Sequence, residues 1–301
     1  MAMLAGVYVD TEDLVRLAAE PQPNIRARRA TGGHSGSLIS RARGRGVDLD
    51  EVRLYQAGDD VRNIDWKVTA RKQKAHTKIF REERERPTVL VIDQSPSMFF
   101  GSQVRMKSVA AAEIAARLAW RTLNTRDRIG GIVIGSNALR VLKPLRSKLN
   151  VIRLLNALSE ANHALNSELR GTTTSRVAWH DVLANIRHTT PIGHRIVFVS
   201  DFEGITDVEL QQLLVLQNHN ELALIHVYDQ LEEALPPSGT YNVTDGANTL
   251  SFSSSSRQNQ NQYRERFEVF KGRLRDACRA RGIRYESITT ADDASRISIH
   301  E

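Results

Sequence analysis

Hard oxygen ligands follow a strongly apolar stretch near residue 93. The stretch "VLVIDQSPSM", residues 89–98, runs from four apolar residues into Asp93, and Ser95 and Ser97 follow at steps of two. Asp and Ser are the usual helix caps between a strand and a helix, so capping is one explanation. A carboxylate and hydroxyls are also the ligands that magnesium, manganese and calcium prefer. The short motif by itself leaves both explanations open.

A second acid follows another apolar strand pattern. The stretch "RIVFVSD" ends at Asp201, and "RGTTTSRVAWH", residues 170–180, places Gly171 and three threonines just before a helical pattern. In an open parallel sheet, ligands bind outside the carboxyl ends of the strands. The residues that we expect to converge at this edge are Asp93, Ser95, Ser97, a threonine from 172–174, and Asp201.

The pattern after Pro87 alternates between strands and helices. It begins with an apolar strand over 88–93 and an Ala-rich helix over 104–124. Such alternation predicts an α/β fold, in which a mostly parallel sheet carries helices on both faces. We also expect a hairpin around Asp245, and a loop over the low-complexity stretch 251–262, before the last long helix.

The region before Pro87 differs in charge and pattern. Residues 21–86 hold 16 Lys and Arg but 9 Asp and Glu, so this segment carries the whole formal excess of +7. A short helix is expected within 7–20, and strand-like alternation over 51–86. A basic segment can bind nucleic acid, an acidic membrane or an acidic protein. It can also be a solvated basic face with no specific partner. Because no aromatic-rich platform or nucleic-acid motif accompanies it, nucleic-acid binding is kept only as an alternative.

Composition and length place further limits on the protein. The chain has 301 residues, 41% of them hydrophobic, which is ample for a core in one or two domains. Cys278 is the one cysteine, so no internal disulfide is possible and a reducing compartment is expected. We find no signal-peptide pattern and no apolar run of the roughly 20 residues that a membrane helix needs. A cytoplasmic protein is therefore expected.

Longer motifs resemble a known family. The series "DQSPSM", "RGT" and "FVSD" is similar to the metal-ion-dependent adhesion site of von Willebrand factor A domains. Residues 58–87, "GDDVRNIDWKVTARKQKAHTKIFREERERP", resemble the signature of the bacterial family known as domain of unknown function 58. Val61 stands where that family often has proline. The resemblance implies a von Willebrand A-like, Rossmann-type domain over 87–301, preceded by a basic, β-containing N-terminal segment over 1–86.

The resemblance also implies a function, namely metal-dependent protein binding without catalysis. Carried over by motif, the implied metal ligands are Asp93, Ser95, Ser97, Thr172 and Asp201. The cation would be Mg²⁺, with Mn²⁺ or Ca²⁺ as alternatives, and a partner's carboxylate would complete its shell. Family members are commonly encoded beside MoxR-type AAA+ ATPases, so the implied partner is such an ATPase in chaperone-like complex assembly. Many members carry membrane helices, but this sequence shows none.

Enzymatic functions are the alternatives to protein binding. A metal-dependent hydrolase using Asp93 and Asp201 would usually add a general base or a second metal, and no further acid or histidine stands at a readable spacing. The stretch "GSQVRMKS", residues 101–108, nearly spells a phosphate loop, but Met106 stands where the motif needs glycine. The hydrolase stays an alternative, and no nucleotide site is predicted.

Overall fold

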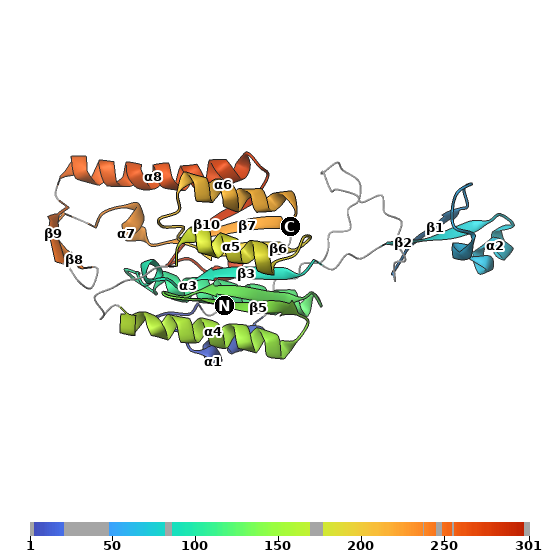
Figure 1. Ribbon diagram of the computed structural model, residues 1–301, viewed down its shortest axis with the longest axis horizontal. Coiled ribbons are helices and arrows are strands. Elements are labelled where there is room, and N and C mark those ends of the chain that lie inside the picture. The colour runs from blue at the N-terminus through green and yellow to red at the C-terminus, as the bar shows by residue number, and fades with distance from the viewer. Residues whose placement is uncertain are drawn as a thin grey trace. The chain divides into compact units, whose positions relative to one another are not determined.

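The chain forms two compact units. The computed structural model describes residues 3–20, 48–81, 86–168, 177–236, 238–244, 249–254 and 256–297 (Figure 1). Contacts group residues 25–85 into a small unit, and residues 1–24 with 86–301 into a large one. The predicted limits of 1–86 and 87–301 stay a prediction, although the described residues 3–20 pack with the large unit.

Helices and strands alternate along most of the described chain, in the small unit as well as in the large one. The α-helices are α1 (Thr11–Arg16), α2 (Trp66–Lys72), α3 (Lys107–Asn124), α4 (Lys148–Glu168), α5 (Trp179–Thr189), α6 (Asp207–Val215), α7 (Gln230–Glu233) and α8 (Arg257–Arg279). The strands are β1 (Asp48–Leu54), β2 (His76–Arg81), β3 (Thr88–Asp93), β4 (Ile129–Ile134), β5 (Leu139–Leu145), β6 (Arg195–Ser200), β7 (Glu221–Tyr228), β8 (Thr240–Thr244), β9 (Thr249–Ser253) and β10 (Arg284–Thr289). Short 3-10 helices are η1 (Leu17–Ala19), η2 (Val61–Asn63), η3 (Pro96–Met98), η4 (Leu216–Asn218) and η5 (Ala294–Arg296).

A six-stranded sheet forms the centre of the large unit. Its order is β10-β7-β6-β3-β4-β5. Strand β5 runs antiparallel to β4, whereas the other neighbours are parallel. Numbered along the chain, these six strands follow the order 3-2-1-4-5-6, which is the doubly wound arrangement. The predicted fold class, a mostly parallel sheet between helices, is confirmed.

Each face of this sheet is covered by its own set of helices. Leu90 and Ile92 of β3 belong to a core cluster with residues of α1, α3 and α4, whereas Val89 and Val91 belong to a second cluster with residues of α5, α6 and α8. Figure 1 shows these two sets of helices on opposite sides of the sheet. Because strand side chains alternate between faces and both faces are covered, β3 is buried at every position and is apolar over 89–92.

A buried ion network joins the N-terminal residues to α3. Glu113 bonds Arg105 on one side and Arg117 on the other, where the Arg117 Nε lies 2.8 Å from its Oε1. The Leu4 amide donates to the same carboxylate at 3.0 Å, and Arg117 also reaches Glu20 at 2.7 Å. These bonds fasten residues 3–20 to the large unit.

The small unit contains a two-stranded antiparallel sheet, β1 with β2. Helix α2 lies between the two strands in sequence, where we predicted strand-like structure only. Its start is set by Asp65, whose carboxylate accepts from the Lys67 and Val68 amides. Asp65 also pairs with Lys78 at 3.6 Å. The signature residue Trp66, which begins α2, is 70% exposed.

Two expectations near the C-terminus had different outcomes. The hairpin around Asp245 is confirmed, since β8 pairs antiparallel with β9, while residues 245–248 lie outside the described residues. The predicted loop over 251–262 is wrong at both ends, because β9 extends to Ser253 and α8 begins at Arg257. The Ser256 side chain accepts from the Asn259 amide and so caps that helix.

Candidate metal centre

The candidate site lies where the strand order of the sheet reverses. Strands β3 and β6 are neighbours at this point, and the helices that follow them cover opposite faces. The loops after their carboxyl ends carry the predicted residues, with Asp93 ending β3 and Asp201 directly after β6. A doubly wound sheet binds ligands at this switch point.

Asp93 is held by both of its carboxylate oxygens. It is 1% exposed. Its Oδ1 accepts from the Ser95 amide at 2.9 Å, and its Oδ2 accepts from the Ser200 hydroxyl at 2.6 Å. Ser200 in turn accepts from the Phe202 amide at 2.8 Å. The carboxylate is therefore fixed between two loops.

The two predicted serines stand side by side. The Oγ atoms of Ser95 and Ser97 are 3.2 Å apart. Ser95 is buried and precedes η3, and its own side chain makes no capping bond there. Two neighbouring ligands of an octahedral Mg²⁺ lie about 2.9 Å apart, given Mg–O distances of about 2.0–2.1 Å. The spacing of the hydroxyls thus fits one edge of such a shell.

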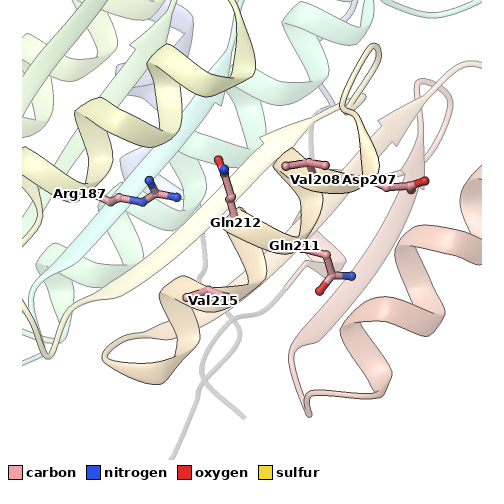
Figure 2. A pocket seen from close by; sticks show the side chains of 6 residues that line it. All are labelled: Arg187, Asp207, Val208, Gln211, Gln212 and Val215. Carbon is pink, nitrogen blue, oxygen red and sulfur yellow. The ribbon is translucent and has the colours of Figure 1, made fainter.

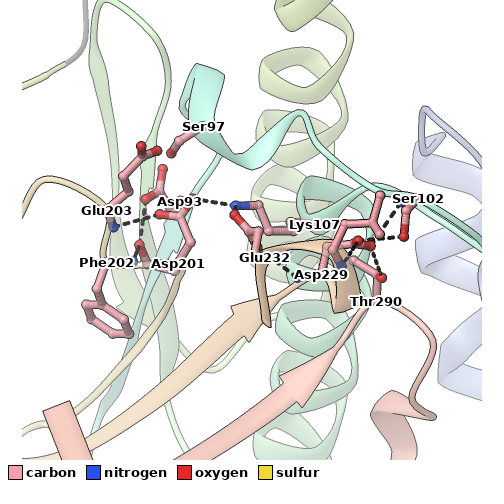
Figure 3. A network of polar contacts seen from close by, with 12 residues as sticks. Asp93, Ser97, Ser102, Lys107, Asp201, Phe202, Glu203, Asp229, Glu232 and Thr290 are labelled. Carbon is pink, nitrogen blue, oxygen red and sulfur yellow. Dashed lines mark hydrogen bonds and ion pairs between the residues drawn. The ribbon is translucent and has the colours of Figure 1, made fainter. Parts of the chain in front are cut away.

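Asp201 faces a lysine that sequence reasoning did not predict. Its Oδ1 accepts from the Glu203 amide at 3.0 Å, and its Oδ2 is 2.9 Å from the ammonium of Lys107 (Figure 3). The next residue, Phe202, is buried with a φ of 54°, a left-handed conformation that turns the chain sharply after the acid. The sequence signal was the stretch 101–108, which fails as a phosphate loop but contains this lysine.

Lys107 also reaches Glu232 of α7, at 2.6 Å. Burial lowers the pKa of the ammonium, but the charges of Asp201 and Glu232 outweigh it and raise the pKa above its ordinary value. Burial raises the pKa of Glu232, and the charge of Lys107 offsets this only in part. The ammonium is therefore a permanent positive charge at the edge of the site.

The donor set fits a hard divalent cation. Asp93, Ser95, Ser97 and Asp201 offer oxygen atoms, as magnesium or calcium sites require. The Asp201 carboxylate already pairs with one cation, the ammonium of Lys107 at 2.9 Å. The fifth predicted ligand, Thr172, lies outside the described residues. In the part of the chain that the structure describes, no group of three or more His, Cys, Asp or Glu forms a metal cluster, so a cation here would depend on the hydroxyls.

A separate hollow lies over α6. It measures about 440 Å³ (Figure 2), and its lining residues are Arg187, Asp207, Val208, Gln211, Gln212 and Val215. None of the predicted site residues that the structure describes is among them. It is therefore distinct from the strand-end site.

The sequence places the chain in a family. Residues 51–276 match the family described as "Protein of unknown function DUF58". The chain belongs to the DUF58 family. The predicted family is therefore confirmed, whereas the metal site that the resemblance implied stays a prediction. None of the helices that the structure describes has both the length and the apolar character that a bilayer crossing needs.

Curated relatives of this DUF58 chain come from mycobacteria. The uncharacterized protein Rv1480 of Mycobacterium tuberculosis (strain ATCC 25618 / H37Rv) is 28% identical over 214 residues, which span 71% of this chain and 64% of the relative. The uncharacterized protein Mb1516 of Mycobacterium bovis matches to the same extent. The match thus covers less than two thirds of the length of these relatives.

Similar solved structures include von Willebrand A domains. The SpRpn10 VWA domain is 14% identical, with a TM-score of 0.38 over 70% of this chain and 91% of that one. The protein BatB from Bacteroides thetaiotaomicron is 10% identical, with a TM-score of 0.38 over 69% of this chain and 93% of that one. An aerotolerance-related membrane protein from Bacteroides fragilis NCTC 9343 is 13% identical, with a TM-score of 0.40 over 69% and 92%.

Proposed function

We propose that this DUF58 chain is a non-enzymatic protein-binding module that depends on a divalent cation, most readily Mg²⁺. The observation that carries the proposal is the convergence of Asp93, Ser95, Ser97 and Asp201 at the switch point of the sheet. When bound there, the cation would supply an acceptor for a carboxylate from a partner protein. In this proposal the chain's own residues orient the oxygen ligands of the cation.

The environment of His226, whose pKa is affected by the charge of Asp201, supports a binding role. The charge of Asp201 acts on the His226 imidazole, but burial dominates and lowers its pKa to about 3. His226 is 1% exposed and bonds the Tyr285 hydroxyl through Nδ1 at 2.9 Å. A general base must reach the proton that it abstracts, and this imidazole is enclosed by aromatic rings.

The partner that we propose is a MoxR-type AAA+ ATPase, in chaperone-like complex assembly in the cytoplasm. The support is the family resemblance, since members are commonly encoded beside such ATPases. The alternative of nucleic-acid binding rests on residues 21–86, of which 21–47 and 82–85 lie outside the described residues. It predicts a steep loss of affinity with salt, which sets it apart from carboxylate capture by a cation.

The test uses the purified full chain and the MoxR-type ATPase from the same genome. Immobilised wild type should retain the ATPase with Mg²⁺ and release it with a chelator. Asp93→Ala and the double variant Ser95→Ala/Ser97→Ala should retain little in either condition, with circular dichroism confirming their fold. Ser251→Ala on β9 is the matched control, since it removes an exposed hydroxyl far along the chain from the site. If the amount of ATPase retained is the same with Mg²⁺, with chelator and in every variant, the metal-dependent proposal is overturned.

A further inference from the structure

Lys107 stands where general physical chemistry disfavours a lysine. It is the first residue of α3, an 18-residue helix. The N-terminus of a helix carries a partial positive charge, so a cation there is destabilising. The side chain is also 2% exposed, and burying an ammonium is costly unless it is paired. Both costs are offset at one place, where the ammonium meets Asp201 and Glu232.

The second of these partners is fixed by a network of its own. The Oε2 of Glu232 accepts from the Asp229 amide at 2.8 Å, which leaves Oε1 for Lys107. Asp229 is buried, and its carboxylate accepts from the Ser102 amide at 2.9 Å and from the Thr290 hydroxyl at 2.6 Å. Figure 3 shows this chain of contacts running from the strand ends to α7. Glu232 is therefore a permanent partner for the ammonium, independent of Asp201.

This arrangement gives Asp201 two possible cations. A divalent ion at the strand ends and the ammonium of Lys107 both need its carboxylate, and two cations beside one acid repel each other strongly in a buried site. Lys107 does not lose all compensation when it withdraws, because Glu232 still holds it. Exchange of one cation for the other at Asp201 thus leaves no buried charge unpaired.

We propose that Lys107 sets the divalent-cation affinity of the strand-end site by competing for Asp201 as a tethered ammonium. The inference rests on the proposed function, since it assigns a specificity-determining residue to the same site. Glu232 is the positioning residue that draws the ammonium away from Asp201. The two side chains therefore have opposite effects on metal binding.

The first experiment measures Mg²⁺ and Mn²⁺ binding to the full chain by titration calorimetry. Lys107→Met removes the competitor and should tighten binding by at least about tenfold, as expected for removing a positive charge within a few Å of the site at an effective dielectric constant of about 20. Glu232→Gln leaves Asp201 as the only carboxylate on the ammonium and should weaken binding several-fold. Lys107→Gln, which keeps a polar side chain, replaces Lys107→Met if that variant does not fold.

Two further variants make the result specific. Lys271→Met removes a lysine that pairs with the neighbouring Glu233 at 3.7 Å and should leave metal affinity unchanged. In the double variant Lys107→Met/Glu232→Gln, competition predicts that Glu232→Gln no longer weakens metal binding by much, because the competing ammonium is gone. A general field effect predicts that the Glu232 change weakens binding equally in both backgrounds, and that outcome would overturn the proposal.

The outcomes separate this inference from the proposed function. If wild type binds the metal ion and Lys107→Met binds it no more tightly, the inference is overturned and the proposed function stands. Binding by Lys107→Met alone supports the inference and shows that the ammonium occupies the site in wild type, which overturns metal dependence for the natural chain. No binding by either protein, with folding confirmed, overturns both.

Discussion

The Ser200 hydroxyl donates a 2.6 Å hydrogen bond to Oδ2 of Asp93, and so joins the ends of two neighbouring parallel strands. The Ser200 hydroxyl oxygen also accepts from the amide of Phe202, where the sharp turn after Asp201 begins. One hydroxyl therefore orients the acids of both loops, although Ser200 itself was not among the predicted site residues. We infer that its role is to position the predicted ligands.

Replacing this hydroxyl should loosen the site and the fold together. In Ser200→Ala, the buried Phe202 amide loses its acceptor, and Asp93 loses one donor. We expect the free energy of unfolding to fall by about 1–3 kcal/mol, the usual cost of an unsatisfied buried polar group. Urea unfolding measures this, with an unchanged m-value showing that the unfolding remains two-state. The exposed control Ser251→Ala should change stability by less than about 0.5 kcal/mol, and equal losses in both variants would contradict the role of Ser200.

The buried Glu113 network should contribute far more to stability than an exposed ion pair of the same type. Glu113→Gln keeps the side-chain volume but removes the negative charge that pairs with the buried Arg105 and Arg117. We therefore expect the free energy of unfolding to fall by about 3–5 kcal/mol. Glu160→Gln is the matched control, because Glu160 pairs with Arg140 on the surface and both side chains are more than half exposed. That change should cost less than about 1 kcal/mol. Chemical denaturation of both variants decides the point, and similar losses would show that the network is not what fastens residues 3–20.

Sequence reasoning predicted the sheet because its strands carry a local signal. Continuous apolar runs rich in β-branched residues, such as 89–92 and 196–199, indicate strands buried on both faces, and the acids that follow them indicate one edge of the sheet. Helix α2 was missed because seven residues give little periodicity, and its only strong signal was the Asp65 cap. Local patterns therefore identified the elements but not every boundary.

The parts of the site that were missed depend on contacts far apart in sequence. Lys107 meets Glu232 across 125 residues, and nothing within 101–108 indicates that partner. Ser200 precedes Asp201 in the same strand end, where a hydroxyl is as typical of a cap as of a ligand support. Predicting either contact needs the strand order, which places β3, β6 and β7 in sequence along the sheet.

Trp66 should be an exposed reporter of the small unit. It is 70% exposed, whereas Trp120 and Trp179 are 3% and 5% exposed. Trp66→Phe should therefore remove most of the tryptophan fluorescence that a soluble quencher such as acrylamide can reach. It should also leave stability within about 0.5 kcal/mol, because little packing is lost. Unchanged quenching in this variant would show that the Trp66 ring is covered in solution.

His226 should make the fold sensitive to mild acid. Burial lowers its pKa to about 3 from an ordinary value of 6.5, so between these values the unfolded chain binds a proton that the folded chain does not. Stability is thus complete above pH 6.5 and falls as the pH drops toward 3, by up to about 1.4 kcal/mol per pH unit for one proton. His226→Phe removes this titration, and its free energy of unfolding should fall less steeply than that of wild type from pH 7 to 4.5. Tyr285→Phe removes only the hydroxyl partner of the ring and should keep the wild-type slope, whereas equal slopes in wild type and His226→Phe would show that the imidazole is not held neutral in the core.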